Sequence, residues 1–176
     1  MKQAIKFLSF VVVAALMLSC SGGAEYYIDN PTSEAITVSV DGKDAVTVNP
    51  GEYKKIEGTL ADGEHTMKVG ENELKFSTDG KSVMLNPTGA VYVKVKQEYG
   101  VGMASEDGYT TIEIDGNKYE GPFEIQSDPA VVVSGVSYGV DEDFPNQVMM
   151  ARGQTKAVKT KLFRKDDFFK FYKSEY

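Results

Sequence analysis

His65 is the only histidine among the 176 residues, so a serine-type catalytic triad in this chain would have to use it. The serine and the carboxylate would have to come from other parts of the sequence, because a triad is defined by geometry and not by chain order. Two carboxylates across a cleft could instead hydrolyse a glycosidic bond, and their separation is a property of the fold. The sequence by itself therefore assigns no catalytic residue.

The densest acidic cluster is Asp141-Glu142-Asp143, and carboxylates gathered on one loop are the ligands that calcium prefers. The spacing of an EF-hand loop would require an acidic or amide residue at position 145 and a glycine at 146. Pro145 and Asn146 break that pattern. Glu106-Asp107, beside a glycine, is no more specific. We therefore expect solvated acidic loops and assign no metal site.

Cys20 is the only cysteine, and it follows a short apolar segment. Lys2 and Lys6 precede twelve mostly apolar residues, 7–18, which are too few to cross a bilayer but typical of a secretory signal peptide. The sequence Leu18-Ser19-Cys20-Ser21-Gly22 resembles the lipobox of bacterial lipoproteins. This resemblance implies a diacylglycerol on the Cys20 sulfur, cleavage before Cys20 and acylation of the new amino terminus.

Lipidation would decide where the protein resides and what it can bind. We expect residues 1–19 to be a signal peptide and residues 20–24 to be a lipidated tether spanning on the order of 10 Å. Cleavage removes two lysines and no acid, so the formal charge of −7 becomes −9. A chain this acidic should be repelled by nucleic acid and held at the membrane by its lipid. Ser21 occupies the position where some diderm bacteria use Asp for inner-membrane retention, which favours the outer membrane.

A lone, lipidated cysteine also limits the chemistry of the exported part. No intramolecular disulfide is possible, so the core alone must stabilise the fold. With one histidine, zinc would find only carboxylates as further ligands. The glycines lie at turns, no phosphate-binding loop is present, and we therefore predict no cofactor.

Short alternating segments with Gly, Pro, Asn or Asp between them recur at intervals of about 8–12 residues. This spacing predicts an all-β fold, an antiparallel β-sandwich of one or two packed subdomains with a short C-terminal helix. For the first hairpin, a three-residue loop would place Val40 opposite Val46 and Val38 opposite Val48, with all four valines on one face. Asp115-Gly116 predicts the turn of a second hairpin.

Residues 38–69, VSVDGKDAVTVNPGEYKKIEGTLADGEHTMKV, resemble the PEGA-type β-module of bacterial envelope proteins. The shared features are an alternating strand into Asp-Gly, a Pro-Gly turn, and a leucine before a Gly-x-His turn and a final strand. Asn49-Pro50 departs from the more usual Thr-Pro. The resemblance implies a sandwich-like fold, an accessory or interaction role, and a structural role for His65.

The irregular stretch 100–108 is the best candidate for a linker. We therefore divide the exported part into a PEGA-like β-sandwich region, 25–99, and a second β-rich region, 100–176. Asn30-Pro31-Thr32 recurs as Asn86-Pro87-Thr88. Because Asn-Pro is a common turn former, we interpret the recurrence as turn chemistry and not as duplication.

The C-terminal residues 159–176 combine six basic and six aromatic side chains in an otherwise acidic chain. A helix capped by Asp166 would carry an aromatic stripe on one face and an i,i+4 pair between Asp166 and Lys170. Such a stripe usually faces a core, so we expect residues 166–176 to close one end of the sandwich. The alternative is a docking element for an envelope protein partner or for the membrane interface.

Three hypotheses for function follow from these features. The first is a membrane-anchored envelope lipoprotein that acts as a non-enzymatic interaction or accessory module. The second is a lipoprotein that binds a glycan or a peptide. The third is a carboxylate-based hydrolase. An interaction module should expose an apolar patch, a ligand-binding protein should have a lined pocket, and a hydrolase should bring acids together in a cleft.

Overall fold

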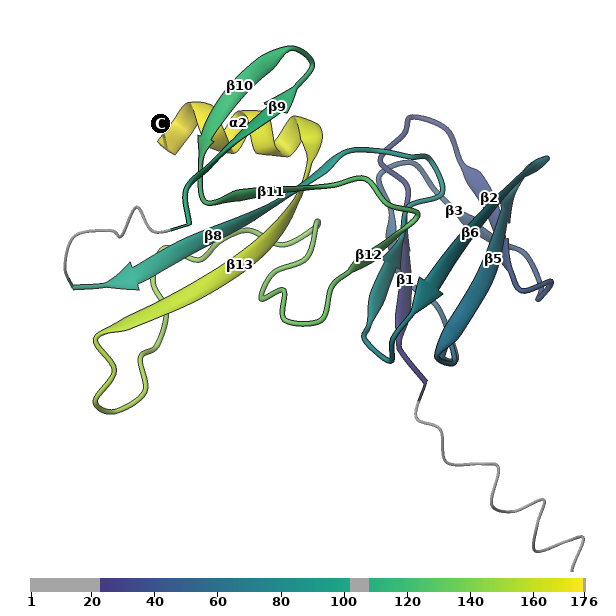
Figure 1. Ribbon diagram of the computed structural model, residues 1–176, viewed down its shortest axis with the longest axis horizontal. Coiled ribbons are helices and arrows are strands. Elements are labelled where there is room, and N and C mark those ends of the chain that lie inside the picture. The colour runs from purple at the N-terminus through teal and green to yellow at the C-terminus, as the bar shows by residue number, and fades with distance from the viewer. Residues whose placement is uncertain (1–22, 102–107, 176) are drawn as a thin grey trace, which may run out of the picture.

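Short strands joined by turns make up most of the computed structural model, which describes residues 23–101 and 108–175 (Figure 1). The all-β class and the short C-terminal helix are confirmed. The predictions on residues 1–22, including the signal peptide and Cys20, and on Glu106-Asp107 lie outside the described residues. The elements are β1 (Tyr26–Asp29), β2 (Ile36–Val40), β3 (Val46–Val48), β4 (Tyr53–Lys55), β5 (Gly63–Val69), β6 (Asn72–Thr78), β7 (Val83–Leu85), β8 (Tyr92–Gly100), β9 (Thr110–Ile114), β10 (Asn117–Gly121), β11 (Phe123–Gln126), β12 (Ala130–Val132), β13 (Lys156–Arg164) and α2 (Lys165–Glu175).

Two four-stranded sheets form the first sandwich, with strand orders β12-β7-β1-β4 and β3-β2-β5-β6. The alternation seen in the sequence places one face of each strand inside: in β2, Val38 and Val40 are buried whereas Thr37 is exposed. β1 pairs with β7 in parallel, which departs from the antiparallel expectation. The buried side chains that the two sheets share are Tyr26, Ile28, Val38, Val40, Val48, Ile56, Leu60, Met67, Phe76, Val83 and Leu85.

The first hairpin is present, but its predicted register is wrong. Val38 lies opposite Val46, and Ile36 lies opposite Val48. A tight turn, closed by a hydrogen bond of 3.0 Å from Lys43 N to Val40 O, uses two residues with positive φ, Asp41 and Gly42. An extra residue on the β3 side then restores the alternation, so the valines keep the predicted face despite the shift. In the second hairpin, Asn117 lies opposite Ile114 across the predicted Asp115-Gly116 turn.

The second part is built on a three-stranded sheet of order β11-β8-β13, with the β9–β10 hairpin and α2 packed on it. Figure 1 shows β8 and β13 running side by side over most of their length, with α2 and the hairpin on the same side of them. Their shared buried core consists of Val93, Val95, Ile112, Ile114, Phe123, Phe163 and Phe168.

The C-terminal helix packs as the sequence predicted, although its start differs. α2 begins at Lys165, directly after β13, so Asp166 lies inside the first turn and is no cap. Lys170 pairs with Asp167 at 2.8 Å instead of with Asp166. Phe168 is fully buried, and Tyr119 lies edge-on to it at 5.4 Å between ring centroids. In the described part of the chain, no helix combines the length and apolar character needed to cross a membrane.

Strand pairing does not follow the predicted division into the regions 25–99 and 100–176. β8, from the region 25–99, pairs with β11 and β13, whereas β12, from the region 100–176, joins the first sandwich beside β7. A third buried cluster contains side chains from both parts and therefore joins them: Met84, Tyr92, Val131, Val140 and Leu162. The two sheet systems thus share one continuous interface.

Candidate functional site

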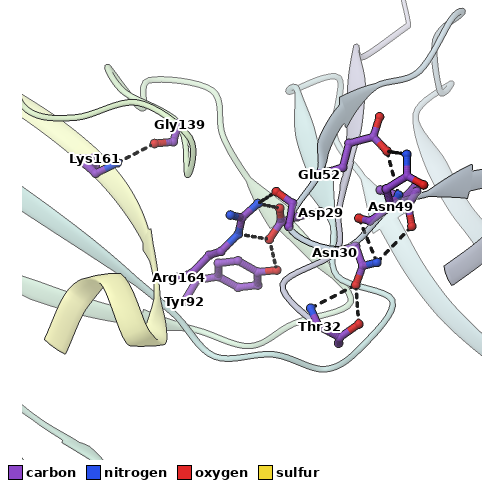
Figure 2. Close-up of polar contacts among 11 residues, drawn as sticks. Asp29, Asn30, Thr32, Asn49, Glu52, Tyr92, Gly139, Lys161 and Arg164 are labelled. Carbon is purple, nitrogen blue, oxygen red and sulfur yellow. Dashed lines mark hydrogen bonds and ion pairs between the residues drawn. The ribbon is translucent and has the colours of Figure 1, made fainter. Parts of the chain in front are cut away.

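A buried carboxylate, Asp29, lies where the two parts meet (Figure 2). It is the last residue of β1 and is fully buried. Arg164, the last residue of β13, donates from Nε to Oδ2 at 3.1 Å and from Nη2 to Oδ1 at 2.5 Å. The Tyr92 hydroxyl, at the start of β8, donates to Oδ2 at 2.7 Å. Three strand ends therefore bring together one acid and its three donor groups.

This cluster resembles a structural clamp more than a catalytic centre. The hydrogen bond with Asp29 raises the pKa of the Arg164 guanidinium, which stays charged. Burial and the neighbouring Asp29 charge raise the pKa of the Tyr92 hydroxyl, which stays protonated and donates. Arg164 also donates to the Gly51 carbonyl at 2.9 Å. Both oxygens of the Asp29 carboxylate are therefore occupied by donors from the fold itself.

The two Asn-Pro-Thr sequences perform the same structural task, which supports their interpretation as turn chemistry. Asn30 and Asn86 are both fully buried. The Asn30 amide donates to the Glu34 carbonyl at 2.7 Å, and the Asn86 amide donates to the Ala90 carbonyl at 2.8 Å. Each asparagine thus closes its own loop four residues ahead, and Asn30 lies next to the clamp (Figure 2).

Lys161 is a buried lysine of β13 that the sequence analysis did not single out. It is 2 % exposed, and its ammonium donates to the Gly139 carbonyl at 2.9 Å and to the Glu142 carbonyl. The ring of Phe163 lies 4.6 Å from Nζ. Burial lowers the pKa of Lys161, while nearby carboxylates oppose that effect. Both carbonyls belong to the 139–142 loop, so Lys161 fastens that loop to the sheet.

His65 has the structural environment that its place in the sequence predicted. Nδ1 lies 2.7 Å from Asp41 Oδ2, and Nε2 lies 2.7 Å from the Ala61 carbonyl. The ring stacks on Phe76 at 5.4 Å between centroids. Burial lowers the pKa of His65, but the hydrogen bonds to Asp41 and Ala61 outweigh it and raise the pKa overall. Both ring nitrogens face acceptors, so the imidazole has no free nitrogen to act as a base.

One match to a catalytic motif was missed from the sequence. Residues 135–139, GVSYG, have the G-x-S-x-G spacing of a nucleophile elbow. That motif requires a strand, a sharp turn and a helix, whereas Ser137 lies in a loop after β12. Its backbone N–H donates to the Thr160 carbonyl at 2.8 Å, and its Oγ accepts from the Thr160 N–H at 3.3 Å. Ser137 therefore holds this loop against β13, and His65 is committed to its own partners.

The acidic residues 141–143 are exposed, as a solvated loop should be. The Glu142 carboxylate accepts from the Gly139 N–H at 2.7 Å, which folds the loop back on itself. A cleft of about 840 Å³ beside the loop contains side chains of both signs, among them Asp143, Lys161 and Asp167. Within the described residues, no three histidine, cysteine or acidic side chains group as metal ligands would.

An apolar groove opens at one edge of the first sandwich, and we call it the edge groove. It encloses about 780 Å³, which is within the range of small-molecule sites, about 300–1,000 Å³. It lies between β3 and β4, the edge strands of the two sheets. Its lining consists of Tyr26, Ile28, Val38, Val40, Gly42, Lys43, Asp44, Val46, Lys54, Lys55, Ile56 and Glu57.

Core side chains form the floor of the edge groove. Tyr26 and Ile28 come from one sheet, Val38 and Val40 from the other, and each is at most 4 % exposed. At the opposite edge of the sandwich, β12 packs against β6. The two sheets are therefore covered on one side and open on the other. Sequence patterning predicted Val38 and Val40 on one face of a strand, but it gave no sign of Tyr26 and Ile28 or of an open edge.

The chain matches no protein-family model, no curated protein and no solved structure. The resemblance of residues 38–69 to the PEGA-type module therefore stays a prediction. The edge groove, the clamp and the loop fastened by Lys161 are the features from which a function can be argued.

Proposed function

We propose that this protein is a lipid-anchored envelope lipoprotein whose exported domain is a non-catalytic ligand-binding module. The lipid on Cys20 holds the chain at the membrane, and the outer membrane is the favoured location. The edge groove is the binding site. Residues 20–25 connect the anchor to β1, which forms part of the groove floor.

One observation carries the proposal: a groove of about 780 Å³ lies at the edge of the sandwich that no further described strand covers. Its volume and its lining, apolar at the floor with charged side chains at the mouth, are those of a small-molecule site. The buried charged side chains are used differently. Asp29, Arg164 and Lys161 all form hydrogen bonds with groups of the fold itself, so we assign them no catalytic role.

The anchor is tested by Cys20→Ala in a bacterium that expresses the precursor. The variant should incorporate no labelled fatty acid and should leave the membrane fraction, because the acyl acceptor is missing. Ser21→Ala, the adjacent substitution, is the matched control and should be labelled like the wild type. Unchanged labelling of the Cys20→Ala protein would refute lipidation at this position.

The binding function is tested by native mass spectrometry of protein purified from the envelope without added ligand. The wild type should carry a non-covalent small-molecule adduct. Val46→Trp places a large ring at the mouth of the edge groove and should lose the adduct. Thr47→Trp, on the opposite face of the same strand, should keep it. An adduct retained in Val46→Trp, or absent from the wild type, would contradict the proposal.

A further inference from the structure

We propose that pH regulates the edge groove and that His65 is the sensor. Its imidazolium holds the loop 57–62, which continues one wall of the groove, and its neutral form releases that loop. The inference rests on the proposed ligand-binding function and names the regulation of the same site. It is drawn from the two hydrogen bonds of the His65 ring and from the places where their partners meet the groove.

His65 links two segments that line the edge groove. It lies on β5, and its side chain is 8 % exposed. Nδ1 lies 2.7 Å from the carboxylate of Asp41, directly before the turn residues 42–44 that line the groove on the β3 side. Nε2 lies 2.7 Å from the carbonyl of Ala61, in the loop that follows the groove residues 56–57 on the β4 side. The ring therefore connects both sides of the groove.

Both partners of the ring can only accept hydrogen bonds, so the geometry suits an imidazole with two protons. A carboxylate and a carbonyl have no proton to donate, whereas a neutral imidazole has one N–H and one lone pair. In neutral His65, one of the two short contacts would join a lone pair to an oxygen. The charged carboxylate of Asp41 is the stronger acceptor, so Nδ1 keeps its proton and the link to Ala61 is lost.

Thr78 makes this loss larger. Its hydroxyl, at the end of β6, donates to the Ala61 carbonyl at 2.6 Å and lies 3.3 Å from Nε2 of His65. In the charged state the carbonyl therefore has two donors, the imidazolium and the hydroxyl. Once Nε2 carries a lone pair, the single hydroxyl proton satisfies either the ring or the carbonyl, and not both. Deprotonation leaves the Ala61 carbonyl with at most one of these two donors.

The groups around the ring determine the direction of the pH dependence. Burial lowers the pKa of His65, but its hydrogen bonds outweigh that effect, so the pKa lies above its usual value of about 6.5. The charged side chains that act on the ring are Asp41 and Lys43, both at the β2–β3 turn. β6 contributes the uncharged ring of Phe76, which stacks on the imidazole. As the pH rises through the raised value, the loop 57–62 loses its link to β5.

The other hydrogen bonds of both segments keep this release local. Leu60 exchanges two backbone hydrogen bonds with Ala24, at 2.8 and 2.9 Å. On the β3 side, Asp41 N donates to Thr66 O at 2.8 Å, and Thr66 N donates to Asp41 Oδ1 at 3.0 Å. None of these four bonds needs a proton on the imidazole. High pH therefore makes the loop 57–62 open more often and leaves the sandwich folded.

The test is NMR on the mature protein, extracted from the membrane in detergent, between pH 5 and pH 9. His65 is the only histidine, so its ring signal reports its protonation directly. The Leu60 amide, which donates to Ala24 O at 2.9 Å, reports opening of the loop through its protection from hydrogen exchange, corrected for the intrinsic rate. That protection should fall about tenfold as the ring loses its proton, as loss of one hydrogen bond to a charged group does. The Leu162 amide, which donates to Tyr138 O at 3.1 Å, is the control and should keep its protection.

Two variants separate the sensor from a general effect of pH. His65→Gln replaces the titrating ring with an amide, so the protection of Leu60 should no longer change with pH. Asp41→Asn keeps an acceptor for Nδ1 but removes its charge, so the ring and the Leu60 amide should both titrate at a lower pH. Asp44→Asn, on the same turn, removes a charge that does not act on the ring and should leave both midpoints unchanged.

The envelope-derived adduct connects the sensor to the groove. In native mass spectrometry the wild type should carry the adduct at pH 5 and lose most of it at pH 9, whereas His65→Gln should carry the same fraction at both. An adduct that is equal at both pH values in the wild type, yet lost in Val46→Trp, would refute the regulation and leave the binding site. No adduct at any pH, with coincident midpoints for the ring and Leu60, would refute the proposed function and leave the sensor. Protection of Leu60 that is independent of pH in the wild type, or that still changes in His65→Gln, would refute the sensor itself.

Discussion

Arg164→Met should destabilise the protein severely, because it leaves a fully buried carboxylate without its counter-ion. Among the described residues, Asp29 would keep only the Tyr92 hydroxyl as a side-chain donor. Removing one partner of a buried ion pair costs about 3–5 kcal/mol, out of a total stability of about 5–15 kcal/mol. For a domain of this size, that loss lowers the melting temperature by roughly 6–20 °C. The exposed pair between Lys55 and Glu25 should contribute little to stability, because water screens it.

Urea unfolding at pH 7 measures this difference directly. Arg164→Met should shift the midpoint strongly, while Lys55→Met should barely shift it. The double variant Asp29→Asn with Arg164→Met should be more stable than Arg164→Met alone, because no unpaired charge then remains. Equal midpoints for Arg164→Met and Lys55→Met, or strictly additive effects in the double variant, would refute the clamp.

Two further predictions concern the helix and the histidine. Deletion of residues 166–176 should lower the melting temperature sharply, because burial of the Phe168 side chain alone contributes about 1.5–3 kcal/mol to stability. An unchanged melting temperature in calorimetry would instead favour a docking role for the helix. The raised pKa of His65 contributes stability below about pH 6.5, and this is lost as the pH rises through the folded value. The lowered pKa of Asp41 contributes stability above about pH 3.8, so the pair stabilises fully between these limits. His65→Gln should therefore lose stability most near pH 5 and least near pH 9; melting curves with equal losses at both would contradict the reasoning.

Local pattern was sufficient to predict the two Asp-Gly hairpin turns but not β1 or the register of the first hairpin. Asp-Gly at 41–42 and at 115–116 identified both hairpins, since both central residues adopt positive φ. In the first hairpin the tight turn and an extra residue on the β3 side together preserved the valine face. Alternation alone cannot distinguish that solution from the three-residue loop, because both put the same side chains inside. The faces were therefore predicted correctly and the pairing was shifted by two residues.

The clamp could not be predicted, because its strands are far apart in sequence and one of them has no strand pattern. β1, with the sequence YYID, buries three of its four residues, including a charged one, so it shows no alternation. Tyr92 and Arg164 lie 63 and 135 residues from Asp29. Only the tertiary fold brings them together. A buried acid, unlike a buried valine, looks like a surface residue in the sequence.

The same topology that creates the clamp also determines which edge of the first sandwich is closed. The second part contributes β12, which pairs with β7 and packs against β6, and so covers that edge. β3 and β4 are joined by a short turn at the other edge, and within the described residues no further strand pairs with either. Lys54 donates to the Thr47 carbonyl of β3 and so limits strand pairing at this edge, where the edge groove lies. An edge that is protected against other strands and still bears a groove is suited to binding a ligand other than a strand.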